Sequence, residues 1–131
     1  MTAAVPSEIL RPGKIILSAG HSVTLLRSRN ALIQSAGYQV VTTRESHLLL
    51  NLAGKQHFDA VVLCNSIPAP LRKNIASELK LLKPTLPVVI LCTESEQHEF
   101  LNVGEKVVLS EHGVSQPLLE AISKVAGEPD D

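Results

Sequence analysis

The chain has 131 residues, which is the size of one ordinary domain. Apolar residues make up 44% of it and charged residues 19%, so it can bury a core without metal or disulfide staples and is not intrinsically disordered. The 12 basic and 13 acidic residues leave a formal net charge of -1, which excludes the basic field that attracts nucleic acid or an anionic membrane.

The cysteine count and the termini indicate the compartment. Two cysteines do not make a secreted disulfide framework. No apolar run is long enough to span a membrane, and the first residues lack the apolar segment of a signal peptide. We therefore expect a cytoplasmic protein with a flexible leader over 1–13, one domain over 14–126 and an acidic tail over 127–131.

Strands and helices alternate along the chain. Short apolar runs, several rich in β-branched residues, predict strands at 15–17, 38–42, 58–63, 88–91 and 107–109. Apolar residues at helical spacing, bounded by Gly, Pro and capping residues, predict helices at 22–36, 48–54, 68–83, 96–103 and 115–125. Ser22 is placed to cap the first helix, and Gly37 to end it in the left-handed conformation. This alternation predicts an α/β fold with a parallel sheet covered by helices on both faces.

Four segments carry a resemblance to a known family. They are Gly37–Val40 at the start of the second strand, Phe58–Leu63 in the third, Pro68 after it, and Leu86–Leu91 in the fourth. In this order and spacing the chain resembles the receiver (CheY-like) domain of two-component response regulators, from about Lys14 to Val125. The resemblance implies a three-layer, doubly wound (flavodoxin/CheY-like) five-stranded parallel sheet of order 2-1-3-4-5, with its site at the carboxyl ends of the strands.

The resemblance also implies which positions carry the chemistry. A working receiver holds Mg²⁺ with three carboxylates, one of which accepts the phosphoryl group, and contacts that group with a hydroxyl and a lysine. Aligned on the same segments, this chain has Gly20 and His21 in place of the acidic pair and Cys64 in place of the phosphoacceptor. Cys92 takes the position of the switch hydroxyl, Ser110 that of the lysine and Val107 that of the switch aromatic. No Asp or Glu lies anywhere in 14–29. We therefore expect a degenerate pseudo-receiver that accepts no phosphate by the receiver mechanism.

The expected function is that of a stand-alone, phosphorylation-independent protein-interaction module in a two-component type of system. It is not expected to be an enzyme, to need a cofactor, or to bind nucleic acid or membrane. Its expected partners are other signalling proteins, or a second copy through the segments 96–103, 107–109 and 115–125, which form the common partner surface in receivers.

Two other functions stay open at this point. His21, Cys64 and Cys92, with His112 nearby, could form a thiol or soft-metal sensor, although buried cysteines are more often small core residues. A small ligand could bind in the emptied pocket. Ser110 and His112 lack the nucleophile elbow and the orienting acid of a hydrolase.

The remaining candidates have simpler explanations. We expect His47, His57 and His98 to be surface residues without partners, and the leucines at 48–50 to belong to the core. A mild basic face on the third helix is expected to be solvated; it consists of Arg72, Lys73, Lys80 and Lys83. Asp59 lies at the amino end of its strand, away from the family's site.

Overall fold

The computed structural model describes residues 13–100, 106–109 and 115–128. The strands are β1 (Ile15–Ala19), β2 (Gln39–Thr43), β3 (Ala60–Leu63), β4 (Val88–Cys92) and β5 (Lys106–Leu109). The helices are α2 (Val23–Ser35), α3 (Ser46–Lys55), α4 (Ala69–Leu82), the 3₁₀ helix η1 (Glu94–Phe100) and α5 (Ser115–Ala126). The expected leader, apart from Gly13, and the end of the expected tail lie outside the described residues. No helix within these described ranges is both long and apolar enough to cross a membrane.

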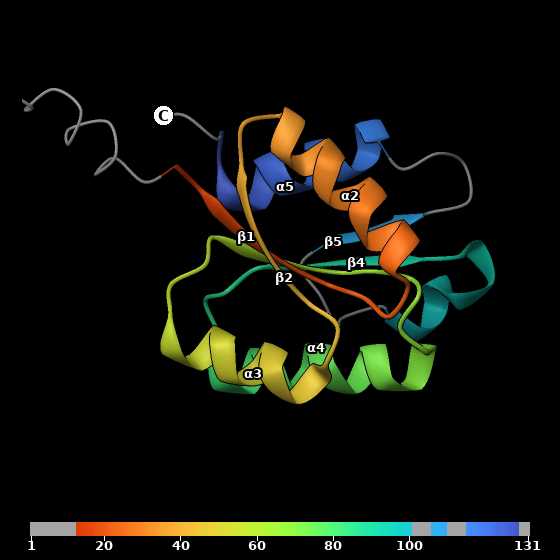
Figure 1. The fold of residues 1–131 in the computed structure, drawn as a ribbon. Coiled ribbons are helices and arrows are strands. Elements are labelled where there is room, and N and C mark those ends of the chain that lie inside the picture. The colour runs from red at the N-terminus through yellow and green to blue at the C-terminus, as the bar shows by residue number, and fades with distance from the viewer. Residues whose placement is uncertain (1–12, 101–105, 110–114, 129–131) are drawn as a thin grey trace, which may run out of the picture.

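All five strands form one parallel sheet in the order β2-β1-β3-β4-β5. Helices α2 and α5 cover one face of this sheet, and α3 and α4 cover the other (Figure 1). The expected three-layer, doubly wound architecture is confirmed. Because every strand runs the same way, the residues that follow β1, β3 and β4 meet at one edge of the sheet.

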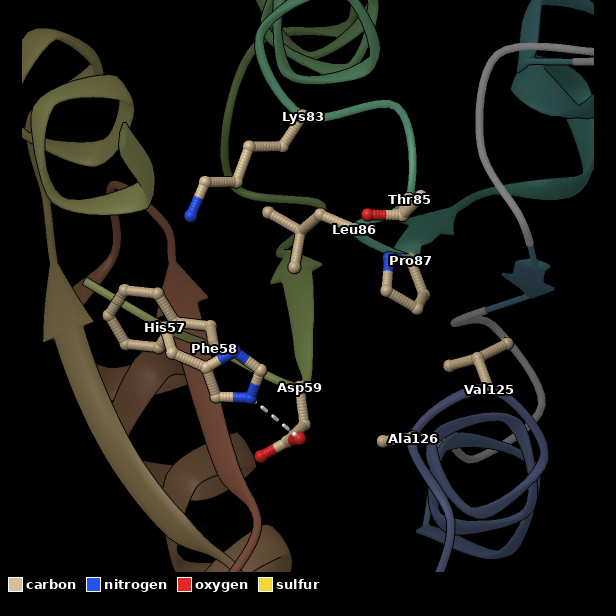
Figure 2. Close-up of a pocket in the computed structure, with 9 residues that line it drawn as sticks. All are labelled: His57, Phe58, Asp59, Lys83, Thr85, Leu86, Pro87, Val125 and Ala126. Carbon is tan, nitrogen blue, oxygen red and sulfur yellow. Dashed lines mark hydrogen bonds and ion pairs between the residues drawn. The ribbon is translucent and has the colours of Figure 1, made fainter. Parts of the chain in front are cut away.

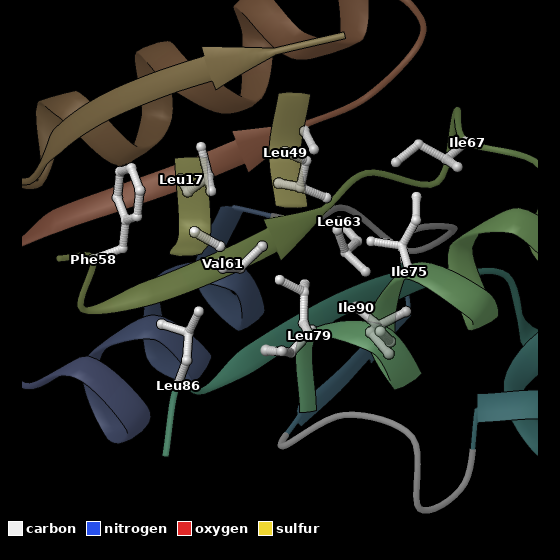
Figure 3. Packing of buried hydrophobic residues seen from close by; sticks show 14 of the residues in the cluster. Leu17, Leu49, Phe58, Val61, Leu63, Ile67, Ile75, Leu79, Leu86 and Ile90 are labelled. Carbon is white, nitrogen blue, oxygen red and sulfur yellow. The ribbon is translucent and has the colours of Figure 1, made fainter. Parts of the chain in front are cut away.

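The side chains of the central strands divide the core into two clusters. Val61 and Leu63 of β3 pack toward α3 and α4 with Leu49 and Leu79 (Figure 3). Val62 points the other way and packs beneath α2 and α5, in the cluster that contains Ile33 and Leu118. This alternation follows from the period-2 pleat of a strand buried on both faces.

The predicted ends of α2 are confirmed. The Ser22 hydroxyl accepts the Leu25 N–H at 3.2 Å, as an N-cap side chain should. Gly37 follows the helix with φ 105°, a left-handed conformation that glycine adopts without a Cβ penalty. Its N–H donates to the Gln34 carbonyl at 2.9 Å, which satisfies one carbonyl of the last turn.

The helical segment predicted at 96–103 differs from the structure in type and position. It is a 3₁₀ helix that begins at Glu94 and ends at Phe100, and 101–103 lie outside the described residues. The Glu96 N–H donates to the Thr93 carbonyl at 3.1 Å, and the Glu96 carboxylate accepts the Thr93 N–H at 3.0 Å. These contacts close a tight three-residue turn, which favours the 3₁₀ form.

Candidate functional site

The loops after β1 and β3 are packed against each other at the carboxyl edge of the sheet. A Cβ added to Gly20 would lie 2.8 Å from the Cys64 Cβ, 3.0 Å from the Ser66 Oγ and 3.1 Å from the Leu26 Cγ. Real Cβ atoms essentially never come within 3.0 Å of another heavy atom. Position 20 therefore has no space for a side chain in this arrangement.

The Ser66 hydroxyl joins the same two loops. Its oxygen accepts the His21 N–H at 2.9 Å and the Ser22 N–H at 3.1 Å. These amides lie just before α2, where backbone donors would otherwise face outward. Because Ser66 already accepts from both of them, they are not available to an incoming anion.

Two guanidinium groups donate hydrogen bonds to these two loops. Arg44 donates from Nη2 to the His21 carbonyl at 3.0 Å, and Arg29 donates from Nη2 to the Asn65 Oδ1 at 3.3 Å. The residues that directly follow β1 and β3 include no Asp or Glu. This part of the edge therefore offers the positive charge of Arg29 and Arg44 to a ligand. Glu45 lines the same hollow as Gly20 and His21, and its carboxylate lies 3.4 Å from the His47 Nε2.

Arg72 connects the loop after β3 to the end of β4. Its side chain is only 1% exposed, although it comes from α4. Its Nη2 donates to the Ile67 carbonyl at 2.8 Å, and its Nη1 donates to the Leu91 carbonyl at 3.0 Å. A weaker bond runs from Nη2 to the Asn65 carbonyl at 3.3 Å. One buried cation thus ties together two chain segments from neighbouring strands.

The positive charge of Arg72 is balanced by Glu96 of η1. Nη1 lies 2.9 Å from the Glu96 Oε1, and the Glu96 side chain is 25% exposed. The hydrogen bond from Arg72 lowers the pKa of Glu96 below its usual value, with a further contribution from the Thr93 N–H. The guanidinium also lies over the Phe100 ring, 4.9 Å from its centroid. We call this group (Arg72, Glu96 and Phe100) the Arg72 clamp.

The prediction that Arg72 belongs to a solvated basic face is wrong. Helical spacing puts Arg72 on the same side of α4 as Ala76 and Leu79, both fully buried, and this spacing could have indicated its burial. Of the other three basic residues, Lys73 is exposed as expected, whereas Lys80 and Lys83 are partly buried.

The cysteines do not come together as a redox or metal pair. Cys64 packs in the cluster beneath α2 and α5, and Cys92 in the cluster toward α3 and α4, on opposite faces of the sheet. They form no disulfide. The described residues contain no group of three His, Cys, Asp or Glu side chains able to hold a metal ion. The structure therefore does not assemble His21, Cys64 and Cys92 into a ligand set.

Two further candidate positions have limited structural information. Val107 lies in β5 with Ile90 as its register partner in β4. Ser110 and His112 lie outside the described residues.

One hollow between the loop after β1 and the start of α3 is small. A hollow bounded by Gly20, His21, Arg44 and Ile67 has a volume of about 10 Å³. That is about the volume needed for one water molecule. This hollow cannot hold the small ligand considered as an alternative.

Two histidines expected to lack partners have them. The His57 Nε2 lies 3.1 Å from the Asp59 Oδ1, and the His47 Nε2 lies 3.4 Å from the Glu45 Oε1.

The leucine run at 48–50 is only partly as predicted. Leu49 is fully buried, but Leu48 is exposed because the helix turns it away from the sheet.

The fold was compared with solved structures. The response regulator TrrA from Thermotoga maritima, in complex with Mg²⁺ and a beryllium fluoride, superposes with a TM-score of 0.77 at 18% identity, covering 86% of this chain and 98% of that one. The receiver domain of a sensor histidine kinase from Pseudomonas aeruginosa, with magnesium in its active-site cleft, gives 0.75 at 16% identity, covering 88% and 98%. A receiver domain protein from Clostridium thermocellum gives 0.75 at 21% identity, covering 86% and 94%.

The chain has the receiver-domain fold. No protein-family model matches the sequence, and no curated protein matches it either. The likeness therefore lies in the backbone arrangement. In this fold, Ser66 joins the loops that follow β1 and β3, and the Arg72 clamp joins the loop after β3 to the end of β4. The carboxyl ends of these three strands meet at one edge of the sheet.

Sequence reasoning did not identify Ser66, Arg72 or Glu96 as residues of this edge. Arg72 carried a spacing signal, as described above. Ser66 and Glu96 carried none, because their contacts join segments that are far apart in the sequence.

Proposed function

We propose that this receiver-like domain is a protein-interaction module of a two-component type of signalling system, and that it works without a phosphoryl group. The proposal includes the lack of a phosphoacceptor aspartate, because Cys64 takes the position after β3 where the resemblance places that aspartate. The observation that carries the proposal is the Arg72 clamp.

The clamp joins the two strand ends that, by the resemblance, the phosphoryl group bridges in a working receiver. By the resemblance, the phosphoryl group on the residue after the third strand is contacted by a hydroxyl after the fourth, and this contact couples the two strand ends. Here Arg72 couples them already, through the Ile67 and Leu91 carbonyls and through Glu96. A state held by a buried ion pair needs no added phosphate.

The metal chemistry of the edge supports the same conclusion. Mg²⁺ needs oxygen ligands, with carboxylates prominent among them, and thiols are poor ligands for it. Cys64 offers a thiol, and Gly20 has no room for the side chain that a carboxylate would require. A divalent cation at this edge would also lie near the Arg29 and Arg44 guanidiniums, which repel it.

In this proposal the domain is cytoplasmic and non-enzymatic. Its partners are other signalling proteins or a second copy, bound through η1, β5 and α5. The clamp supports that surface, because Glu96 and Phe100 belong to η1 and are held in place by Arg72. The conformation of this part of the surface is then set by the fold.

The test is to incubate the full chain with phosphoramidate and Mg²⁺ and to measure its intact mass, with a phosphorylatable receiver treated in parallel. The proposal predicts no adduct on this chain and a full adduct on the control. A stoichiometric gain of about 80 Da on an acidic residue would refute it. Sedimentation of the same samples gives the second readout, which is expected not to change with phosphodonor.

A further inference from the structure

We propose that a second site, at the amino edge of the sheet, binds a small organic anion such as a carboxylate or phosphate monoester carrying an apolar body. The site is a pocket of about 380 Å³ formed by the residues just before β3, the loop between α4 and β4, and the end of α5 (Figure 2). This volume falls in the range of about 300–1,000 Å³ that is typical of small-molecule pockets. The amino edge lies opposite the edge discussed above, so the inference does not depend on the proposed function.

The wall formed by the loop between α4 and β4 is preorganised. Pro84 and Pro87 restrict the backbone there. The Lys83 N–H donates to the Leu79 carbonyl at 2.8 Å, and the Leu86 N–H donates to the Lys83 carbonyl at 2.9 Å. A loop fixed in this way loses little conformational entropy when a ligand binds.

The opposite wall carries a chain of hydrogen bonds. The Asp59 Oδ2 accepts the Ile15 N–H at 2.8 Å, and its Oδ1 lies 3.1 Å from the His57 Nε2. An ionised carboxylate only accepts hydrogen bonds, so the bonded imidazole nitrogen carries the proton. Both oxygens of Asp59 are thus engaged within the protein, and its negative charge is directed at His57 and the β1 backbone.

Lys83 supplies a cation that this wall does not neutralise. Figure 2 shows its side chain reaching over the pocket, with the Thr85 hydroxyl on the same rim. Within the described segments no carboxylate forms an ion pair with Lys83. The pocket therefore offers one ammonium group and one hydroxyl donor, while its one lining carboxylate, that of Asp59, is hydrogen-bonded to Ile15 and His57.

Carbonyl groups at the nearby helix ends are partly occupied. The Leu79 carbonyl accepts from the Lys83 N–H, and at the end of α5 the Ser123 carbonyl accepts the Gly127 N–H at 3.0 Å. These are the last regular bonds of the two helices, and beyond them the Lys83 carbonyl accepts the Leu86 N–H at 2.9 Å, which reduces the negative potential that the end of α4 directs into the pocket. The remaining lining is apolar, from Leu86, Pro87 and Val125. Together these features favour an anionic head with an apolar body.

The test is a titration of the ¹⁵N-labelled full chain, followed by backbone amide shifts. The probes are phenyl phosphate and benzoate, with inorganic phosphate and benzylamine as comparisons. The proposal predicts saturable shifts at 57–59, 83–87 and 125–126 with phenyl phosphate or benzoate, and weaker or no binding of the other two. Lys83→Gln is expected to weaken binding about tenfold, because it removes a charge-assisted hydrogen bond.

Lys73→Gln is the matched control, since Lys73 is an exposed lysine of α4, the helix that Lys83 directly follows, and does not line the pocket. It is expected to bind like the unmodified chain. The proposal is overturned if neither aromatic anion shifts these residues, if Lys83→Gln binds as tightly as Lys73→Gln, or if benzylamine binds more tightly than phenyl phosphate. Equal binding of inorganic phosphate and phenyl phosphate would contradict the assignment of an apolar body.

Discussion

Replacing Arg72 with methionine should lower the free energy of unfolding by about 3 kcal/mol. Methionine fills much of the same volume without a charge, so the change removes the hydrogen bonds and the ion pair while limiting cavity formation. The Arg72 side chain is almost fully buried and donates to three main-chain carbonyls as well as to Glu96.

The magnitude follows from what is left behind. Removing one partner of a buried ion pair costs about 3–5 kcal/mol, largely because the other charge stays buried. Here the Glu96 side chain is 25% exposed and can turn toward water, so leaving its charge unpaired accounts for less of this cost. The Ile67 and Leu91 carbonyls, however, lose their bonds to Arg72 in a buried region, at about 1–3 kcal/mol for each unsatisfied group. These opposing corrections keep the expected loss near the lower end of that range.

Urea unfolding followed by circular dichroism measures this loss. For a domain of this size the midpoint should fall by about 1–3 M. Lys73→Met is the matched control, because Lys73 is the exposed neighbour on the same helix, and it should change stability by less than about 0.5 kcal/mol. Since Arg72→Met removes a large fraction of a typical domain's stability, Glu96→Gln gives a milder second variant, with an expected loss of about 1 kcal/mol.

The double variant Arg72→Met/Glu96→Gln completes the cycle. It should lose less stability than the sum of the single variants, because the second change removes the carboxylate that the first one leaves unpaired. The reasoning is refuted if Arg72→Met costs less than about 1 kcal/mol, or if the two changes are strictly additive.

The other predictions use different parts of the molecule. Gly20→Ala should destabilise the domain by about 1–3 kcal/mol through overpacking. Gly54→Ala in α3 should leave stability unchanged or raise it, because its Cβ would meet only an ordinary 3.6 Å contact with Leu82 of α4. Equal effects of the two changes in urea unfolding would contradict the close packing at Gly20. The hydrogen bond from the guanidinium lowers the pKa of Glu96, so the stability that the ionised carboxylate adds is fully present above about pH 4.3, the usual pKa in an unfolded chain. This stability is lost as the pH falls through the pKa of the folded state, so the difference in unfolding free energy between the unmodified chain and Glu96→Gln should shrink on acidification. A constant difference would argue against the ion pair. Burial raises the pKa of the Tyr38 phenol, as does the charge of Glu128, so phenolate absorbance should appear at higher pH in the folded chain than in denaturant. Its hydroxyl donates to a carbonyl after α5 at 2.9 Å, and Tyr38→Phe should cost about 1 kcal/mol in thermal or urea unfolding; no loss would mean that this bond does not fasten the end of α5.

Local signals in the sequence predicted much of the fold. Ser22 and Gly37 bracket α2 because capping depends on residues within one turn of the helix end. The alternation of apolar strands and helices sufficed for the layered parallel sheet, since each element must bury its apolar face.

The candidate site was less predictable, because it depends on register. Leu63 of β3 pairs with Ile90 of β4, so Cys64 continues the strand onto the face of Leu91, and Cys92 falls on the other face. A shift of one residue would have put both sulfurs on the same side. No pattern within either strand specifies this offset, and for this reason a cysteine pair was a reasonable hypothesis from sequence alone.

A titration of the ¹⁵N-labelled chain with Mg²⁺ and beryllofluoride tests the central claim most directly. The claim is that protein groups close the carboxyl edge of the sheet: Gly20 against Cys64, Ser66 across the two loops, and the Arg72 clamp between β3 and β4. The account predicts no saturable shift of the amides at 20–22, 64–67 and 91–96 up to millimolar concentrations. Magnesium-dependent, saturable beryllofluoride binding at those amides would contradict it.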